Sequence, residues 1–229
     1  MKAFLLAAGI GSRLRPLTET TPKCLIPIAG KPLMYYWFQL FEQHGITDVL
    51  INLNYLPDQV RSFVDRQDFE LNVELFYEEQ LLGSAGTLRA CRNFVNNEES
   101  FLICYADNLT NMNLTDLITQ HKNTHPLLTI GLFKTDKPTE CGIVELDEHK
   151  NVISFIEKPQ KPVSNLAGAG IYVASQDVLN YIDGDNPVDI GYHLLPKLVG
   201  NMKGYLIRDY FLDIGSPQNY EKATMDWNL

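Results

Sequence analysis

The residues best suited to chemistry lie near the start of the chain, where small residues are followed by basic ones. The apolar stretch from Lys2 to Leu6 leads into a loop of small residues that ends at Ser12. Because these residues carry almost no side chain, their backbone N–H groups can approach a ligand closely and point together at an anion. The first 32 positions hold five basic residues and one acidic residue, although the whole chain has a formal charge of −9. This contrast predicts a phosphate-binding loop.

Gly9 and Gly11 fit neither of the two best-known phosphate-binding motifs. A Walker A motif needs Gly-x-x-x-x-Gly-Lys-Ser/Thr, and the sequence contains no such run. The dinucleotide-binding motif needs a third glycine where Leu14 stands, followed at once by a helix pattern. A bare Gly-x-Gly also suits an ordinary tight turn. The flanking residues are therefore needed to distinguish a phosphate-binding loop from such a turn.

Two aspartates stand at the ends of expected strands. Asp107 closely follows the apolar run Phe101–Tyr105, and Asp213 lies in Phe211-Leu212-Asp213-Ile214-Gly215. Ligands of open α/β sheets bind at the carboxyl ends of strands, and two carboxylates with phosphate oxygens and water suit Mg²⁺. A strand-end aspartate is also common as a turn or cap residue. Only the fold can unite two residues so far apart in the sequence.

The elements that would position these residues alternate between strand and helix patterns. Strands are predicted at Lys2–Leu6, Val49–Leu53, Val73–Tyr77, Phe101–Tyr105 and Leu127–Phe133. Helices are predicted at Pro32–Gln43, Pro57–Arg66, Ser84–Phe94 and Leu114–Lys122. This alternation is typical of an α/β domain with a mostly parallel sheet.

The pattern changes after residue 133. A hairpin is predicted from Gly142–Leu146 and Val152–Ile156, and the later elements are expected at Ala167–Ala174, Gln176–Ile182, Ile190–Leu198, Tyr205–Arg208, Tyr210–Asp213 and Pro217–Met225. We therefore expect one domain over 1–229, with a nucleotide-binding half at about 1–125 and a half for the second substrate at about 126–229.

Composition limits the function classes. The chain of 229 residues is 45% hydrophobic and 21% charged, and it has no apolar run long enough to cross a membrane. Its first residues lack the pattern of a signal peptide, and its four cysteines show no C-x-x-C spacing, so we expect reduced cysteines and a cytoplasmic location. The acidic balance argues against nucleic-acid binding.

A longer stretch resembles a known family. Leu6 to Thr18, Pro22-Lys23-Cys24-Leu25-Ile26-Pro27-Ile28 and Gly30-Lys31-Pro32-Leu33 resemble the signature of the sugar-1-phosphate nucleotidyltransferases, also called nucleoside-diphosphate-sugar pyrophosphorylases. The resemblance implies a Rossmann-like three-layer α/β sandwich with a smaller α+β sugar-binding lobe. It also implies a reaction in which a sugar-1-phosphate attacks the α-phosphorus of a nucleoside triphosphate and pyrophosphate leaves. Such chemistry depends on cations and positioning.

The resemblance also implies roles for individual residues. Arg13 would hold the departing pyrophosphate and Lys23 would meet the transferred phosphate. Outside this signature, either residue would more often be a solvated surface cation. Glu78 to Thr87 resembles the base-binding loop, in which Glu78 or Gln80 would read the base edge, and Glu157-Lys158-Pro159 resembles the sugar-site motif. The implied nucleotide-binding residues are Leu6, Ala7, Ala8, Gly9, Gly11, Ser12, Glu78, Gln80, Gly83 and Ser84. The implied sugar-phosphate residues are Asn108, Glu157, Lys158 and Gly170, and the implied Mg²⁺ ligands are Asp107 and Asp213.

The chain departs from the family pattern at a few positions. Ala106 replaces the usual glycine before the first aspartate, Leu81 replaces a proline, and Gly168 stands where relatives often have asparagine, which predicts free space beside the sugar. Glu140 to Asp147 together with Glu157-Lys158-Pro159 looks most like the mannose-1-phosphate guanylyltransferases or their heptose-phosphate relatives. Thymidylyl, uridylyl and cytidylyl transfer stay open, as do a catalytically silent nucleotide-sugar sensor and a monomer or homo-oligomer.

Overall fold

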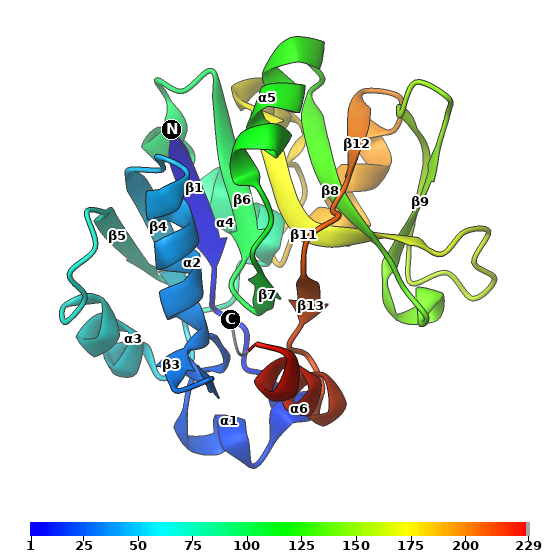
Figure 1. Cartoon of the computed structure of the whole chain (residues 1–229). Coiled ribbons are helices and arrows are strands. Elements are labelled where there is room, and N and C mark those ends of the chain that lie inside the picture. The colour runs from blue at the N-terminus through cyan, green and yellow to red at the C-terminus, as the bar shows by residue number, and fades with distance from the viewer. Residues whose placement is uncertain (228–229) are drawn as a thin grey trace. The chain divides into compact units, whose positions relative to one another are not determined.

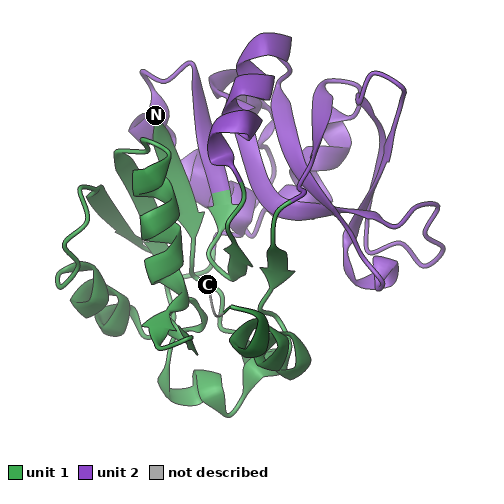
Figure 2. Cartoon of the chain, in the orientation of Figure 1, with its two compact units in different colours: residues 1–81, 104–112, 209–229 green, residues 82–103, 113–208 purple. Residues whose placement is uncertain are grey.

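The strands and helices of the first half follow the predicted alternation, as Figure 1 shows for the computed structural model, which describes residues 1–227. The fold is mixed α/β with a large, mostly parallel central sheet, as the sequence predicts. Contacts divide the chain into two compact units that are interleaved in sequence (Figure 2). Unit 1 holds residues 1–81, 104–112 and the chain from 209 onward, and unit 2 holds residues 82–103 and 113–208.

Unit 1 is built on three parallel strands. β1 (Lys2–Leu6) pairs with β4 (Asp48–Leu53), and β4 pairs with β5 (Asn72–Tyr77). Helix α2 (Leu33–Gln43) lies across this sheet and buries Trp37, Phe38 and Phe41, while α3 (Pro57–Val64) connects β4 to β5. Because all three strands run the same way, the loops that follow them leave the sheet at one edge.

The rest of unit 1 consists mostly of short elements, of which the sequence predicts only β13 and α6. They are η1 (Ser12–Leu14), α1 (Leu17–Thr20), η2 (Lys23–Leu25), β2 (Pro27–Ile28), β3 (Lys31–Pro32), β7 (Asn108–Thr110), β13 (Phe211–Asp213) and α6 (Pro217–Asp226). A buried cluster that includes Leu14, Ile26, Leu109 and Ile214 packs these segments together. This small core joins the start of the chain to its end.

Unit 2 contains the hairpin that the sequence predicts. β9 (Gly142–Leu146) and β10 (Val152–Glu157) pair antiparallel, and β11 (Leu166–Ser175) pairs antiparallel with both β9 and β8 (Leu128–Lys134). β12 (Met202–Leu206) adds to β8 in parallel. The helical elements of this unit are α4 (Ser84–Ala90), η3 (Arg92–Val95), α5 (Leu114–Thr124), η4 (Pro138–Glu140), η5 (Gln176–Tyr181), η6 (Ile190–Leu194) and η7 (Leu195–Leu198). β6 (Ser100–Tyr105) runs from unit 2 into unit 1.

Three expected helices differ from the prediction in type. The α-helix at 84–94 ends at Ala90 and continues as a 3₁₀ turn, and the helix expected at 176–182 is 3₁₀ throughout. The segment 190–198 forms a π turn followed by a 3₁₀ turn. Pro196 lacks the N–H that an α-helix needs, and Gly191 weakens the helix further. The strand expected at 205–208 begins three residues earlier, at Met202.

Two expectations from composition concern the whole chain. Among residues 1–227, no helix is both long and apolar enough to span a membrane. The four cysteines are free thiols, as predicted. Cys24, Cys91 and Cys104 are buried, and Cys141 is partly exposed.

Candidate active site

The loop after β1, residues 6–12, is shaped by one glycine in particular. We call it the phosphate loop. Gly11 has a φ of +68°, and a Cβ atom there would lie 3.0 Å from Thr18 Cγ2 and 3.1 Å from Lys23 Cβ. The Thr18 hydroxyl donates a hydrogen bond of 2.8 Å to the Gly11 carbonyl. The loop therefore packs directly on the stem of Lys23, and any other residue at position 11 would push the two apart.

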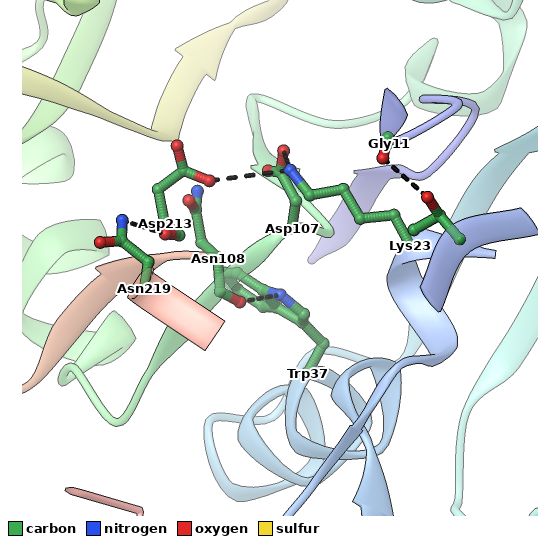
Figure 3. Close-up of polar contacts among 8 residues, drawn as sticks. Gly11, Lys23, Trp37, Asp107, Asn108, Asp213 and Asn219 are labelled. Carbon is green, nitrogen blue, oxygen red and sulfur yellow. Dashed lines mark hydrogen bonds and ion pairs between the residues drawn. The ribbon is translucent and has the colours of Figure 1, made fainter. Parts of the chain in front are cut away.

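Lys23 lies between the two aspartates that the sequence singles out (Figure 3). Its side chain is 9% exposed, and its Nζ lies 2.5 Å from Asp107 Oδ2 and 3.7 Å from Asp213 Oδ1. Gly215 brings Arg13 to the same place, because a Cβ at Gly215 would lie 3.0 Å from Arg13 Nη2 and 2.9 Å from both Asp213 oxygens. The structure thus unites Arg13, Lys23, Asp107 and Asp213, which we call the charged cluster.

Pairing between β7 and β13 brings the two aspartates together across about a hundred residues of sequence. Asp213 is opposite Asn108 in this antiparallel pair, and the Ile214 N–H donates to the Asp107 carbonyl at 2.8 Å. The Trp37 indole N–H holds the Asn108 carbonyl at 2.9 Å, and the Asn219 side chain donates to the Asp213 carbonyl at 2.7 Å. Helices α2 and α6 therefore hold both strands in place.

The charged cluster sets two carboxylates against two cations, and burial has the largest effect on its titration. The pKa of Asp213 is raised to about 6, chiefly by burial and then by the neighbouring Asp107 carboxylate, while Lys23 and Arg13 act in the opposite direction. Asp213 Oδ1 is fully enclosed and accepts no hydrogen bond from residues 1–227, although the side chain as a whole is 46% exposed. An enclosed carboxylate oxygen without a donor is an unfavourable arrangement unless a cation binds it.

The donor set fits a divalent cation with oxygen ligands. Two carboxylates, one of them with an unsatisfied oxygen, are hard ligands of the kind that Mg²⁺ uses together with substrate phosphates and water. The described residues hold no group of three or more His, Cys, Asp or Glu that would form a complete protein cage. The arrangement therefore suits a metal that shares its coordination with a substrate.

The strand next to β1 supplies a residue that the sequence analysis did not single out. Asn52, at the end of β4, accepts a hydrogen bond of 2.7 Å from the Ala7 N–H and donates one of 2.8 Å to Glu78 Oε1. The Ala7 N–H is therefore satisfied within the protein, in contrast to the expectation that the loop N–H groups point at an anion. A polar residue inside the apolar run Val49–Leu53 was the available signal.

The expected base loop, residues 78–87, runs from unit 1 into unit 2, and its residues in unit 1 differ in exposure. Glu78 is 3% exposed and bonded to Asn52, whereas Gln80 is exposed. Asn54 adds a hydrogen bond of 2.9 Å from its side chain to the Glu78 carbonyl. In this structure Glu78 anchors the loop, and Gln80 is the side chain that solvent can reach.

In unit 2, Gly83 and Ser84 are held by a segment that the sequence analysis treated only as a helix. Gly83 has a φ of +79°, and a Cβ there would lie 2.4 Å from the Val188 carbonyl oxygen. The Ser84 hydroxyl donates to Asp189 Oδ2 at 2.9 Å and accepts from the Ile190 N–H at 2.8 Å. Asp189 followed by an apolar residue is a helix N-cap signal, and its side chain does cap η6.

The same segment of unit 2 packs on Glu157. A Cβ at Gly191 or at Gly142 would lie 2.6 Å from Glu157 Oε2, so two glycines leave room for this carboxylate. The Glu157 side chain is 18% exposed, and Lys158 Nζ, 4.0 Å from Oε1, is its ion-pair partner within residues 1–227. Burial raises the pKa of Glu157, Lys158 lowers it, and Asp189 raises it again.

Lys158 has a second neighbour, because its Nζ lies 5.8 Å from the centre of the Tyr192 ring. We call Glu157, Lys158, Gly191 and Tyr192 the glutamate site.

Two other expected sugar-site glycines lie on β11. Gly170 has a φ of +66° and lies within an irregularity of the β11–β8 pairing. A Cβ at Gly168 would lie 3.1 Å from Cδ1 of the fully buried Ile130. A larger side chain at the partly buried Gly168 would therefore press on Ile130, and free space for the sugar beside it stays a prediction.

The chain belongs to the nucleotidyl transferase family, whose model matches residues 2–228. It is 31% identical to mannose-1-phosphate guanyltransferase of Schizosaccharomyces pombe and 32% identical to UTP–glucose-1-phosphate uridylyltransferase of Synechocystis. These alignments cover 98% and 97% of this chain but 63% and 62% of the two relatives, so the chain spans less than two thirds of their length.

Solved structures share the fold over almost the whole chain. A Bacillus anthracis protein in complex with a sucrose matches with a TM-score of 0.88 at 24% identity, covering 100% of this chain and 97% of that one. HddC of Yersinia pseudotuberculosis complexed with GMP-PN matches with a TM-score of 0.83 at 24% identity, covering 99% of both chains. These neighbours confirm the α/β fold that the sequence predicts.

Proposed function

We propose that the protein transfers a nucleotidyl group from a nucleoside triphosphate to a sugar-1-phosphate and releases pyrophosphate. The observation that carries this proposal is the charged cluster, in which Lys23 contacts Asp107 and Asp213 directly beside Arg13 and the phosphate loop. Membership of the nucleotidyl transferase family supports the same reaction class. A silent sensor would not need both carboxylates together with both cations.

In the proposed mechanism the residues of the charged cluster position phosphates. An oxygen of the sugar-1-phosphate attacks the α-phosphorus, and the bond from that phosphorus to the bridging oxygen breaks, so that the leaving group carries its electrons away as pyrophosphate. Lys23 stabilises the charge at the transferred phosphate, and the guanidinium of Arg13 binds the pyrophosphate oxygens with two parallel donors. Both cations act in a site where the neighbouring carboxylates already hold them in position.

Asp107 and Asp213 would hold the divalent cation, for which we propose Mg²⁺. When bound, the cation would neutralise phosphate charge and orient the triphosphate. Lys23 lies against the same two carboxylates, so a cation held by them would leave the charge of Lys23 available to the substrate phosphate. The enclosed Asp213 Oδ1, which accepts no hydrogen bond from residues 1–227, supports this assignment.

For the base we propose guanine, and for the sugar a mannose- or heptose-type 1-phosphate. Relatives named as mannose-1-phosphate guanyltransferases in Schizosaccharomyces pombe and Aspergillus oryzae support this choice. The glutamate site would bind the sugar-1-phosphate, since a carboxylate with no hydrogen bond from residues 1–227 can accept two sugar hydroxyls. Lys158 would meet its phosphate.

A substrate grid tests the proposal. Five nucleoside triphosphates are combined with common sugar-1-phosphates, and pyrophosphate release is measured with and without Mg²⁺. We expect GTP with mannose-1-phosphate or a heptose-1-phosphate to give the highest kcat/KM. Faster turnover with UTP, dTTP or CTP would change the base assignment, and no turnover with any pair would contradict the reaction class.

A further inference from the structure

Asn52 lies on β4, the middle one of three neighbouring strands. The two outer strands lead into the two expected nucleotide-binding loops. β1 continues into the phosphate loop and β5 continues into the base loop, with β4 between them. In the sheet register Asn52 stands opposite Leu6 on one side and opposite Phe76 on the other. It is 4% exposed and lies among the apolar residues of β4.

The side-chain amide of Asn52 connects both loops at once. Its oxygen accepts from the Ala7 N–H at 2.7 Å, and its nitrogen donates to Glu78 Oε1 at 2.8 Å. An amide can accept on one side and donate on the other, whereas a carboxylate only accepts and an aliphatic side chain does neither. The contact with Glu78 is buried and the contact with Ala7 is partly buried, so loss of the first leaves a buried polar group unsatisfied.

We propose that Asn52 is a positioning residue that holds the phosphate loop and the base loop at the separation a nucleoside triphosphate requires. This inference rests on the proposed function, because it assigns the two loops to the two ends of one nucleotide. Asn52 acts through Ala7 and Glu78. Its effect is to order both loops before the nucleotide binds, which reduces the entropy lost on binding.

Two substitutions of similar size separate the two hydrogen bonds. Asn52→Asp keeps the acceptor for the Ala7 N–H but loses the donor to Glu78 and places two carboxylates together. Asn52→Leu loses both bonds. Binding of GTP and of inorganic tripolyphosphate, each with Mg²⁺, is measured by calorimetry, since tripolyphosphate has no base and probes the phosphate loop alone.

We expect Asn52→Asp to weaken GTP binding about ten-fold and tripolyphosphate binding less than about two-fold. Asn52→Leu should weaken both ligands by about ten-fold or more. A purely structural role would lower both affinities together in Asn52→Asp. That result, or unchanged GTP affinity, would overturn the proposal.

Two further variants control for misfolding and for the loss of a neighbouring hydrogen bond to Glu78. Asn54→Ala removes the nearby hydrogen bond to the Glu78 carbonyl and should change the ratio of the two affinities less than Asn52→Asp does. If Asn52→Asp does not fold, the double variant Asn52→Asp with Glu78→Gln restores the bond with reversed polarity and should recover GTP binding. A folded double variant that binds tripolyphosphate but not GTP would contradict the bridge. Absence of triphosphate binding by the wild type would instead contradict the proposed function.

Discussion

The charged cluster and the glutamate site both combine carboxylates with lysine, but they differ in how closely the charges approach. In the charged cluster Lys23 contacts Asp107 at 2.5 Å, and Arg13 adds a second cation. In the glutamate site Lys158 Nζ stays 4.0 Å from Glu157 and lies over the Tyr192 ring. The first arrangement is suited to exchanging one cation for another. The second leaves a partly buried carboxylate ready to accept hydrogen bonds from hydroxyl groups.

The two sites also differ in how the chain makes room for them. In the charged cluster Gly215 admits Arg13 and Asp213, whereas in the glutamate site Gly142 and Gly191 both face a single carboxylate oxygen. The absence of two Cβ atoms gives the Glu157 carboxylate its room, and a side chain at either glycine would displace it. The contrast predicts that changes in the charged cluster affect the chemical step, and that changes in the glutamate site affect binding of one substrate.

The largest effect is expected for the aspartates of the charged cluster. Asp107→Asn and Asp213→Asn should each lower kcat by orders of magnitude, about 10²-fold or more, because each removes a ligand of the proposed divalent cation. Pyrophosphate release at saturating substrate measures this, and Asp58→Asn on the exposed surface of α3 is the control. Near-normal rates in both variants would remove the basis for the metal assignment.

Lys23→Ala should lower kcat about 10²- to 10³-fold, with a smaller change in KM, because its charge acts on the phosphate whose charge rearranges. Lys122→Ala, an exposed lysine on α5, should leave the rate unchanged. Separate measurements of kcat and of both KM values decide the outcome. A change confined to KM would show that Lys23 contributes ground-state binding.

In the glutamate site, Glu157→Ala should raise KM for the sugar-1-phosphate about 10- to 100-fold, since a hydrogen bond to a charged group contributes about 1.5–3 kcal/mol. KM for the nucleotide is the internal control and should hardly change. Gly191→Ala should reproduce the effect, because the added Cβ would lie 2.6 Å from Glu157 Oε2. If the nucleotide KM rises and the sugar KM does not, the two sites have been assigned to the wrong substrates.

The smallest expected effect is a pH-dependent change in thermal stability when Asp213 of the charged cluster is replaced. In the folded state the pKa of Asp213 is raised from 3.8 to about 6. Proton uptake therefore contributes stability that is complete below about pH 3.8 and is lost as the pH rises through about 6. Asp213→Asn cannot ionise and should unfold at a higher temperature than the wild type at pH 7.5.

Since the Asp213 side chain is 46% exposed, screening reduces the expected gain of Asp213→Asn to about 1 kcal/mol, or about 2–4 °C. Thermal unfolding at pH 7.5 and pH 4 measures it, and the difference from the wild type should shrink at the lower pH. A variant that is less stable than the wild type at pH 7.5 would show that Asp213 is favourably paired. Burial of the Asp213 carboxylate would then not be destabilising in the charged cluster.

The sequence by itself determined the features that depend on local physics. Apolar runs such as Lys2–Leu6 and Phe101–Tyr105 form the predicted strands, because such runs are stable only when buried in a sheet. The helix at Leu33–Gln43 and the hairpin of β9 and β10 also match their patterns. Gly11 and Gly83 adopt the positive φ that their residue type permits. Membership of the family was likewise readable from the first 33 residues.

Only the tertiary structure decided which of these residues meet. The approach of Asp107 to Asp213 depends on the pairing of β7 with β13, two strands of three residues that carry no periodicity. The bridge from Ala7 through Asn52 to Glu78 depends on the register of three strands, and a shift of one residue would turn Asn52 to the other face. The surroundings of Gly168 also depend on tertiary structure, because the β11–β8 pairing places Ile130 next to it. Register and packing are properties of contacts between distant segments, so no local pattern encodes them.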